Sequence, residues 1–542
     1  IRALDDDLMP LIARLTGLRR LGLGGVQVST RALAPLAQLP QLEELSTPKG
    51  ITDAGMAEIE KIQSLKSLDV FHDWMTDEGL RSLGKLTSLE VLFLYGNSKM
   101  TDDGLKGLTQ LSSLRHLRLG MEGLFTDRGM DHLAAMPSLK VLWLDTHNVT
   151  DEGLRRLSKS RSLERLSVHW IDNITDRGVV CLKKMPQLKG LDVWSAKLTN
   201  AGLEHVASMP NLDHLVLPGF EFTDAGIGHL AKLKHLKYLW VSCISNSPLT
   251  DTSLMAICQM PKLEELYIGG TGFTNEGIEL LQNLENLSAL NITFWSGLDN
   301  ETLKLLARLP KLRELSLGSS ESITMSGLNA LNRLAGLENL SIRNIHQDDG
   351  GLDLSGLKKL RSLRIMLRHE TTRIGKEFVL TWDAYHDSDL TSLSGLTNLE
   401  NLSLTGSGIG DAGLKHLAAL TNLKHLQIQG SANLTADGLR HLTNMSRLDS
   451  LFIGDSRITE QGLAHLYHLK TLHIIRIKSA IPISGQAIVR LRTELPHLQT
   501  LDISQPKQPV RRSQTLKPRA RSQDSTAKPR SARTRNNTRR RR

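Results

Sequence analysis

A short motif recurs along the chain at nearly constant spacing, and this periodicity restricts the fold more than any other feature. The motif is Thr-Asp-x-Gly followed by an apolar residue, with Asn200 in the Asp place of one copy, and its first eight starts lie 24 or 25 residues apart. A chain of 542 residues would otherwise suggest several globular domains. A repeat array instead grows by stacking units that pack only on their neighbours. The first eight copies start at Thr52, Thr76, Thr101, Thr126, Thr150, Thr175, Thr199 and Thr223.

Each motif leads into apolar residues spaced by three and finally by two. In one regular unit these are Leu414, Leu417, Leu420, Leu423, Leu426 and Ile428. Steps of three predict a helix of about two turns, and the closing step of two predicts a short strand. About 20 such strand cores follow one another, from Leu21–Leu23 to Leu501–Ile503. We therefore expect an α/β solenoid, a curved right-handed superhelix with a parallel inner sheet and short outer helices.

The residues of the motif have structural explanations. Thr can cap the helix by accepting a hydrogen bond from a free amide of the first turn. Asp is favoured at the positive end of the helix dipole. Gly permits close approach of the adjacent coil. We therefore interpret these aspartates as structural residues and expect no active-site acids among them.

The pattern T-D-x-G-L-x-x-L-x-x-L-x-x-L-x-x-L-x-L resembles leucine-rich repeats of the ribonuclease-inhibitor-like class. It is similar to the 24-residue repeats of planctomycete and other bacterial proteins, and to those of eukaryotic F-box substrate receptors. The resemblance covers about residues 8–504 and implies a leucine-rich repeat solenoid that binds other proteins. No F-box-like helical segment is visible in this sequence.

Side chains alternate along each strand, so the residues before, between and after the two buried apolar positions should face the concave side. Nine of the 21 aromatic residues occupy such positions, and Phe452 is the only one of the nine outside Phe71–Tyr267. Aromatic enrichment is typical of interface cores. Alternatively, the rings pack on one another across strands. The predicted partner-binding residues are Phe71, Phe93, Tyr95, Arg118, Trp143, His169, Trp194, Tyr238, Trp240 and Tyr267.

The repeat is interrupted once. The strand core Leu363–Ile365 is followed by the next core, Leu402–Leu404, after 39 residues. The extra residues predict an irregular insertion at about 368–388, which we interpret as a solvated loop or a flap beside the solenoid. Its acids and histidines match no metal-binding spacing, so we expect no metal site there. They are His369, Glu370, Asp383, His386, Asp387 and Asp389.

The net charge of +10 belongs to the carboxyl-terminal tail. Residues 507–542 hold 14 basic residues and one acid, which leaves 53 basic and 56 acidic residues before them. We expect residues 1–505 to form the solenoid and residues 506–542 a disordered basic tail. The tail could contact nucleic acid or an acidic surface, or could be without function.

The sequence carries no catalytic signature, and we expect a non-catalytic scaffold without cofactor or metal. Its partner would be a protein bound on the concave face. Alternatively, the chain is a substrate-recruiting or regulatory part of a larger enzyme or receptor, such as a ubiquitin-ligase-type adaptor, whose other domain precedes residue 1. We expect no membrane span. A cytoplasmic location is favoured, with export left open because the chain starts at Ile1 and its amino terminus looks incomplete.

Overall fold

Twenty strands of the described residues, one from each repeat, form a single parallel sheet in the computed structural model of the chain. Residues 1–505 form one compact unit. The structure describes residues 6–71, 74–96, 99–120, 124–145, 147–169, 173–195, 197–218, 222–242, 249–293, 297–320, 322–374, 377–406 and 408–504, with only the backbone for 370–382. The sequence-based prediction of an α/β leucine-rich repeat solenoid with about 20 coils is confirmed.

Each strand pairs in parallel with the strand of the next repeat, and β15 pairs directly with β18. The strands are β1 (Arg20–Gly22), β2 (Glu44–Ser46), β3 (Ser67–Phe71), β4 (Val91–Tyr95), β5 (His116–Leu119), β6 (Val141–Asp145), β7 (Arg165–His169), β8 (Gly190–Val193), β9 (His214–Pro218), β10 (Tyr238–Ser242), β11 (Glu265–Gly269), β12 (Ala289–Thr293), β13 (Glu314–Ser319), β14 (Asn339–Ile345), β15 (Ser362–Leu367), β18 (Asn401–Thr405), β19 (His425–Gln429), β20 (Ser450–Ser456), β21 (Ile474–Ser479) and β22 (Thr500–Ser504).

A short helix follows most strands, because the repeat allows only about two turns before the chain returns to the sheet. The α-helices are α1 (Met9–Ile12), α2 (Asp53–Ile59), α3 (Asp77–Leu83), α4 (Asp102–Leu108), α5 (Gly129–Ala134), α6 (Asp151–Leu157), α7 (Asp176–Cys181), α8 (Asn200–Val206), α9 (Asp224–Leu230), α10 (Asp251–Ile257), α11 (Asn275–Glu279), α12 (Asn300–Leu306), α13 (Asp411–Leu417), α14 (Ala436–Leu439), α15 (Glu460–Leu463) and α16 (Gly485–Glu494). Short 3₁₀ helices span Asp6–Leu8, Thr30–Gln38, Leu182–Lys184, Leu280–Asn283, Ser326–Arg333, Asp387–Gly395, Arg440–Leu442 and Ala464–His468.

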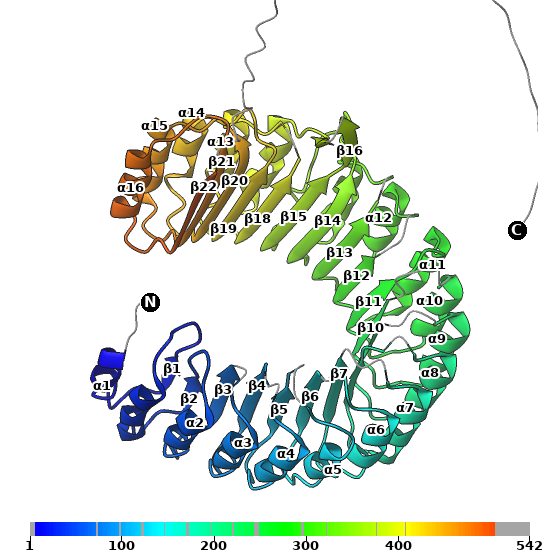
Figure 1. Cartoon of the computed structure of the whole chain (residues 1–542). Coiled ribbons are helices and arrows are strands. Elements are labelled where there is room, and N and C mark those ends of the chain that lie inside the picture. Colours follow the sequence, from blue (N-terminus) through cyan, green and yellow to red (C-terminus); the bar gives the residue numbers. More distant parts are fainter. Residues whose placement is uncertain are drawn as a thin grey trace, which may run out of the picture. The chain divides into compact units, whose positions relative to one another are not determined.

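The two kinds of element occupy opposite sides of the stack. Within the solenoid, the strands line the inner, concave side and the helices form the outer side (Figure 1). Strands pack about 4.8 Å apart, whereas helices need about 8–10 Å, so a stack of such units curves towards its strands. The sheet therefore presents one continuous concave face.

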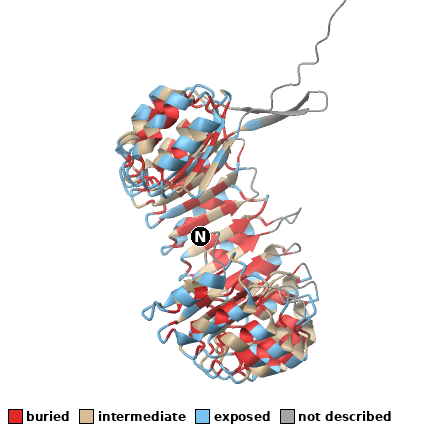
Figure 2. Cartoon of the chain, turned by 60° about the vertical axis from the view of Figure 1, so that its left-hand side comes forward, coloured by how far each residue is buried: buried red, intermediate tan, exposed pale blue. Residues whose placement is uncertain are grey.

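The core lies between the two layers and is almost entirely aliphatic. In β6, Leu142 and Leu144 are fully buried while Val141 and Trp143 are half-buried, and Figure 2 shows this banding along the strands. On the helix side of the same coil, Leu154 and Leu157 are also fully buried. The buried residues point into the core and their neighbours point to the concave face, as the alternation of the sequence predicts.

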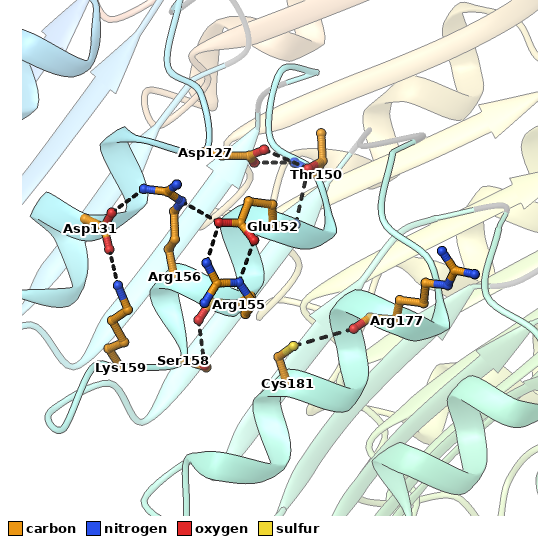
Figure 3. A network of polar contacts seen from close by, with 10 residues as sticks. All are labelled: Asp127, Asp131, Thr150, Glu152, Arg155, Arg156, Ser158, Lys159, Arg177 and Cys181. Atoms are coloured by element: carbon orange, nitrogen blue, oxygen red, sulfur yellow. Dashed lines mark hydrogen bonds and ion pairs between the residues drawn. The ribbon is translucent and has the colours of Figure 1, made fainter.

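The repeat motif joins each coil to the next. The carboxylate of Asp127 accepts from the backbone N–H of Thr150 at 2.7 Å and from the hydroxyl of Thr150 at 2.7 Å (Figure 3). The Thr150 hydroxyl in turn caps α6 by accepting from the N–H of Glu152 at 3.2 Å. The same pairing joins Asp77 to Thr101 and Asp411 to Thr435. We call this series of bonds the Asp–Thr ladder. It confirms the predicted threonine cap and gives the aspartate a partner in the neighbouring coil.

The motif glycine fits against the same carboxylate. A Cβ atom at Gly178 would lie 2.5 Å from Oδ1 of Asp151 in the preceding coil. Real Cβ atoms do not approach an oxygen this closely, so glycine is required by the spacing of the coils. This agrees with the close approach expected from the sequence.

The insertion contains an antiparallel pair outside the main sheet. β16 (His369–Ile374) pairs with β17 (Glu377–Trp382), with His369 opposite Trp382. The chain re-enters the solenoid through Tyr385, whose buried hydroxyl donates to the carbonyl of Ile365 at 3.0 Å. Much of the stretch predicted to be irregular is therefore a hairpin.

Candidate functional site

The aromatic residues predicted from the sequence lie on the concave face of β3 to β11. Each strand places three residues on this face, which we call the leading, middle and trailing positions. Phe93, Trp143, Trp240 and Tyr267 occupy middle positions, and all are half-buried. We define the aromatic strip as Phe71, Phe93, Tyr95, Trp143, Trp194, Tyr238, Trp240 and Tyr267.

The first part of the strip lies on β3 to β6. Phe71 stacks on Tyr95 with ring centroids 5.0 Å apart and an interplanar angle of 9°. Phe93 meets Tyr95 at 6.2 Å and the edge of Trp143 at 6.1 Å. The guanidinium of Arg118 lies 5.3 Å from the centroid of Tyr95, which is a cation–π contact. These rings form one connected cluster.

The second part lies on β8 to β11. Trp194 and Trp240 meet edge to face at 5.3 Å, and Trp240 lies 6.1 Å from Tyr267. Tyr238 lies 5.3 Å from Tyr267 and stacks on His214 at 4.2 Å. The rings thus contact one another across strands, as one interpretation of the sequence expected. They are nevertheless half-buried, so part of each ring faces solvent.

A polar network separates the two clusters. Arg118 donates to Oδ2 of Asp145 at 2.9 Å, and Nδ1 of His169 lies 3.1 Å from Oδ1 of the same carboxylate. Burial raises the pKa of Asp145, but the contacts with His169 and Arg118 outweigh it and hold this pKa below its ordinary value. The carboxylate is therefore charged at neutral pH.

The order Asp145, His169, Ser167 in this network has the connectivity of a hydrolase triad. Nε2 of His169 lies 2.9 Å from the hydroxyl of Ser167. That hydroxyl is buried, and it also donates to Oδ2 of Asp192 at 3.0 Å. A nucleophilic serine needs an accessible oxygen whose proton passes to the histidine. Since the Ser167 hydroxyl donates its hydrogen bond to Asp192, we interpret the network as a structural bridge between β6, β7 and β8.

Charged side chains on the outer helices are paired between coils. Arg156 bridges Glu152 at 2.8 Å and Asp131 of the preceding coil at 2.5 Å, and Lys159 binds Asp131 at 2.7 Å (Figure 3). Hydrogen bonds from Arg155 lower the pKa of Glu152 to about 2. These pairs are only partly buried and suit a solvated surface that holds neighbouring helices together.

All ten residues predicted to bind a partner lie on this one face of the solenoid. Arg118 and His169 belong to the polar network, and the other eight are the aromatic strip. Their role in binding stays a prediction. Glu265 and Glu314 were not among the predicted residues; they occupy leading positions on β11, the strand of Tyr267, and on β13. Their position in the strand pattern was a signal that could have identified them.

The insertion residues have structural contacts. Oδ1 of Asp387 accepts from the N–H of Gly410 at 2.7 Å, which is the role of the ladder aspartate. Asp389 is buried and accepts from the N–H of His386 at 2.8 Å. Among the described residues, no group of three or more His, Cys, Asp or Glu side chains is placed to hold a metal ion. The side chain of Glu370 and the tail 506–542 lie outside the described part of the chain.

The comparison with family models finds leucine-rich repeats in this chain. A model described as a leucine-rich repeat region matches residues 4–243, and a leucine-rich repeat model matches residues 395–418. No curated protein matches the sequence significantly. The repeats and the observed solenoid together identify the chain as a leucine-rich repeat protein.

Solved structures of similar fold share little sequence with this chain. A leucine-rich repeat protein of Leptospira interrogans is 17% identical, with 87% of this chain and 97% of that chain covered and a TM-score of 0.40. An internalin of Listeria monocytogenes is 20% identical, with 78% and 93% covered and a TM-score of 0.34. The TLR13–ssRNA13 complex gives 17% identity, 90% and 76% coverage and a TM-score of 0.46. At this identity the likeness concerns the fold alone.

Solenoids of this family commonly act as scaffolds that bind other proteins. In the described part of the chain, no helix is both long and apolar enough to cross a bilayer.

Proposed function

We propose that the chain is a non-catalytic scaffold that binds a partner protein through the aromatic strip on its concave face. The observation that carries this proposal is the pair of half-buried ring clusters on adjacent strands, from β3 to β11. Aromatic side chains with one face free supply large contact area at low entropic cost. An adaptor that recruits a substrate would use the same surface.

The polar network adds specificity to this surface. Arg118 and His169 hold the carboxylate of Asp145 in place between the two ring clusters. A partner that covers both clusters must also cover this network, and its polar groups must match Arg118 and Asp192. Partners that leave these groups unpaired would bind less tightly, because buried polar groups without partners are costly.

The test uses the triple variant W143A/W194A/W240A of the full chain. Partners are captured by crosslinking in a lysate of the source cells and identified by mass spectrometry. We expect the variant to lose the partners that the wild type captures, because the removed rings form the centre of the strip. Some stability is lost as well, at about 0.5–1.5 kcal/mol for each ring pair, and a thermal melt records it.

The matched control is F452A, which removes a ring from a middle position on β20, outside the strip. F452A should capture the same partners as the wild type. The proposal would be contradicted if a folded triple variant captured the same partners as the wild type. It would also be contradicted if F452A and the triple variant lost the same partners.

A further inference from the structure

Beside the last ring of the strip, the concave face carries an excess of negative charge. Glu265 and Glu314 occupy leading positions on β11 and β13, with the small residue Ala289 between them on β12. Glu314 accepts from the amide of Asn339 at 3.1 Å. Among the described residues, neither carboxylate has a salt bridge within 4.0 Å. By contrast, Arg118 and Arg165 on the same face are each bound to an aspartate.

The ionisable groups around these carboxylates respond to the same negative potential. Burial and then the charge of Glu314 raise the pKa of Glu265, and they outweigh the opposing effect of His214. Burial, followed by the charges of Glu265 and Glu314, raises the pKa of Tyr267. Opposite charge nearby would lower both values. The surface is therefore electrostatically complementary to a cation.

The same place is hollowed. The residues next to Tyr267 in the middle row are short, and they leave a hollow of about 270 Å³. Its lining includes Tyr267, Ala289, Asn291, Glu314, Ser316 and Ser341. One side of the Tyr267 ring is in contact with Tyr238 and Trp240 on β10, and the ring also borders the hollow on β12.

Asn291 on β12 lines the hollow, but its side-chain oxygen is not open to a ligand there. Oδ1 of Asn291 is buried and receives no hydrogen bond from the described residues. Arg364 lies at the opposite end of the hollow, on β15, and makes that end positive. The cation is therefore expected at the end formed by β11 to β13.

We propose that this hollow binds an arginine or lysine side chain of the protein partner, with the cation near the ring of Tyr267 and between Glu265 and Glu314. The inference rests on the proposed function, since it names the chemistry of one contact of that partner. The two carboxylates stand on strands about 10 Å apart, which leaves room for a guanidinium between them. Tyr267 supplies a π face and the glutamates supply charge.

The test selects peptides on the full chain. A phage-displayed library of random 12-residue peptides is panned on the immobilised protein, and the selected peptides are then synthesised. We expect arginine or lysine at one position in the selected peptides. Replacing that residue by glutamine, or using the E265Q/E314Q protein, should weaken binding about tenfold or more.

The control variant E279Q/E301Q removes two carboxylates of the outer helices and gives the same change in net charge. It should bind the peptides like the wild type. Selected peptides without a basic residue, peptides that bind E265Q/E314Q as tightly as the wild type, or a library that yields no binder would each overturn the inference. Peptides that depend on Trp143, Trp194 and Trp240 but not on the glutamates would overturn only the cation site. Peptides whose binding does not depend on these tryptophans would contradict the proposed function itself.

Discussion

The two halves of the sheet share one construction and present different surfaces. From β3 to β11 the concave face carries the aromatic strip, whereas from β12 to β19 the middle positions hold small or polar residues. These are Asn291, Ser316, Ser341, Arg364, Ser403 and Gln427. The Asp–Thr ladder runs through both halves, joining Asp151 to Thr175 in one and Asp411 to Thr435 in the other.

The residues that hold the solenoid together are therefore different from those that it presents to a partner. The ladder and the leucine core lie away from the concave face, so residues on that face can change without disturbing them. A change in the ladder should therefore cost similar stability in both halves. A change on the concave face should have different effects in the two halves.

The largest stability effect is expected from G178A and G438A, one in each half. Each added methyl group would collide with a ladder carboxylate, that of Asp151 or Asp411. Overpacking of this kind costs about 1–3 kcal/mol. Urea unfolding followed by hydrogen exchange would measure the loss and locate it. G228A is the control, because a Cβ at Gly228 meets nothing within 4 Å. A large loss of stability in only one half would contradict the expectation that the ladder stabilises both halves equally.

A smaller effect is expected from R118A. This change leaves the Asp145 carboxylate, whose side chain is 7% exposed, without its arginine partner and with only the imidazole of His169 beside it. We expect a loss of about 1–2 kcal/mol, reduced by solvent because Arg118 itself is 38% exposed. R364A changes the same middle position in the other half, where the described residues give Arg364 no ion pair, and should shift stability by less than about 0.5 kcal/mol. Equal losses in urea unfolding would show that the polar network adds nothing to the aromatic half.

The smallest effect is expected on the stability of the fold at acid pH. Burial opposes ionisation of Asp224, but hydrogen bonds from Ser253 and Thr250 still hold its pKa below the ordinary value. Since the folded pKa is the lower one, Asp224 stabilises the fold above its unfolded pKa. That contribution is lost as pH falls through the folded value. In the other half, Asn300 holds the equivalent place and bonds to Thr324 without titrating.

We therefore expect the variant D224N to lose part of the acid sensitivity of this coil. The chain already contains the natural example Asn200, whose Oδ1 accepts from the N–H of Thr223 at 3.1 Å and whose amide donates to the hydroxyl of Thr223. Urea unfolding at pH 7, 4 and 3 would compare D224N with the wild type. An unchanged pH dependence in D224N would assign the acid sensitivity to other carboxylates.

The fold could be predicted from the sequence because every coil repeats the same local signals. The steps of three and two define helix and strand, and alternation then places Trp143 and Tyr267 on the concave face. The partner of each ladder aspartate was not predicted, since it lies about 24 residues ahead and depends on how two coils stack. The role of Asp387 was hidden because Gly410 replaces the usual threonine. The hollow is lined by Tyr267, Asn291 and Glu314 from three strands, which no single repeat reveals.

The hairpin of β16 and β17 shows that such a chain can gain residues between two strands without losing the stacking of its coils. β15 and β18 pair in register from Ser362 and Asn401 onward, although the hairpin stands between them in the sequence. The added residues leave the stacking of the coils intact, because Tyr385 and Asp387 restore the core and the ladder where the chain returns. This junction is therefore a natural grafting point, at which evolution or an engineer can exchange one appendage for another while the solenoid continues unchanged.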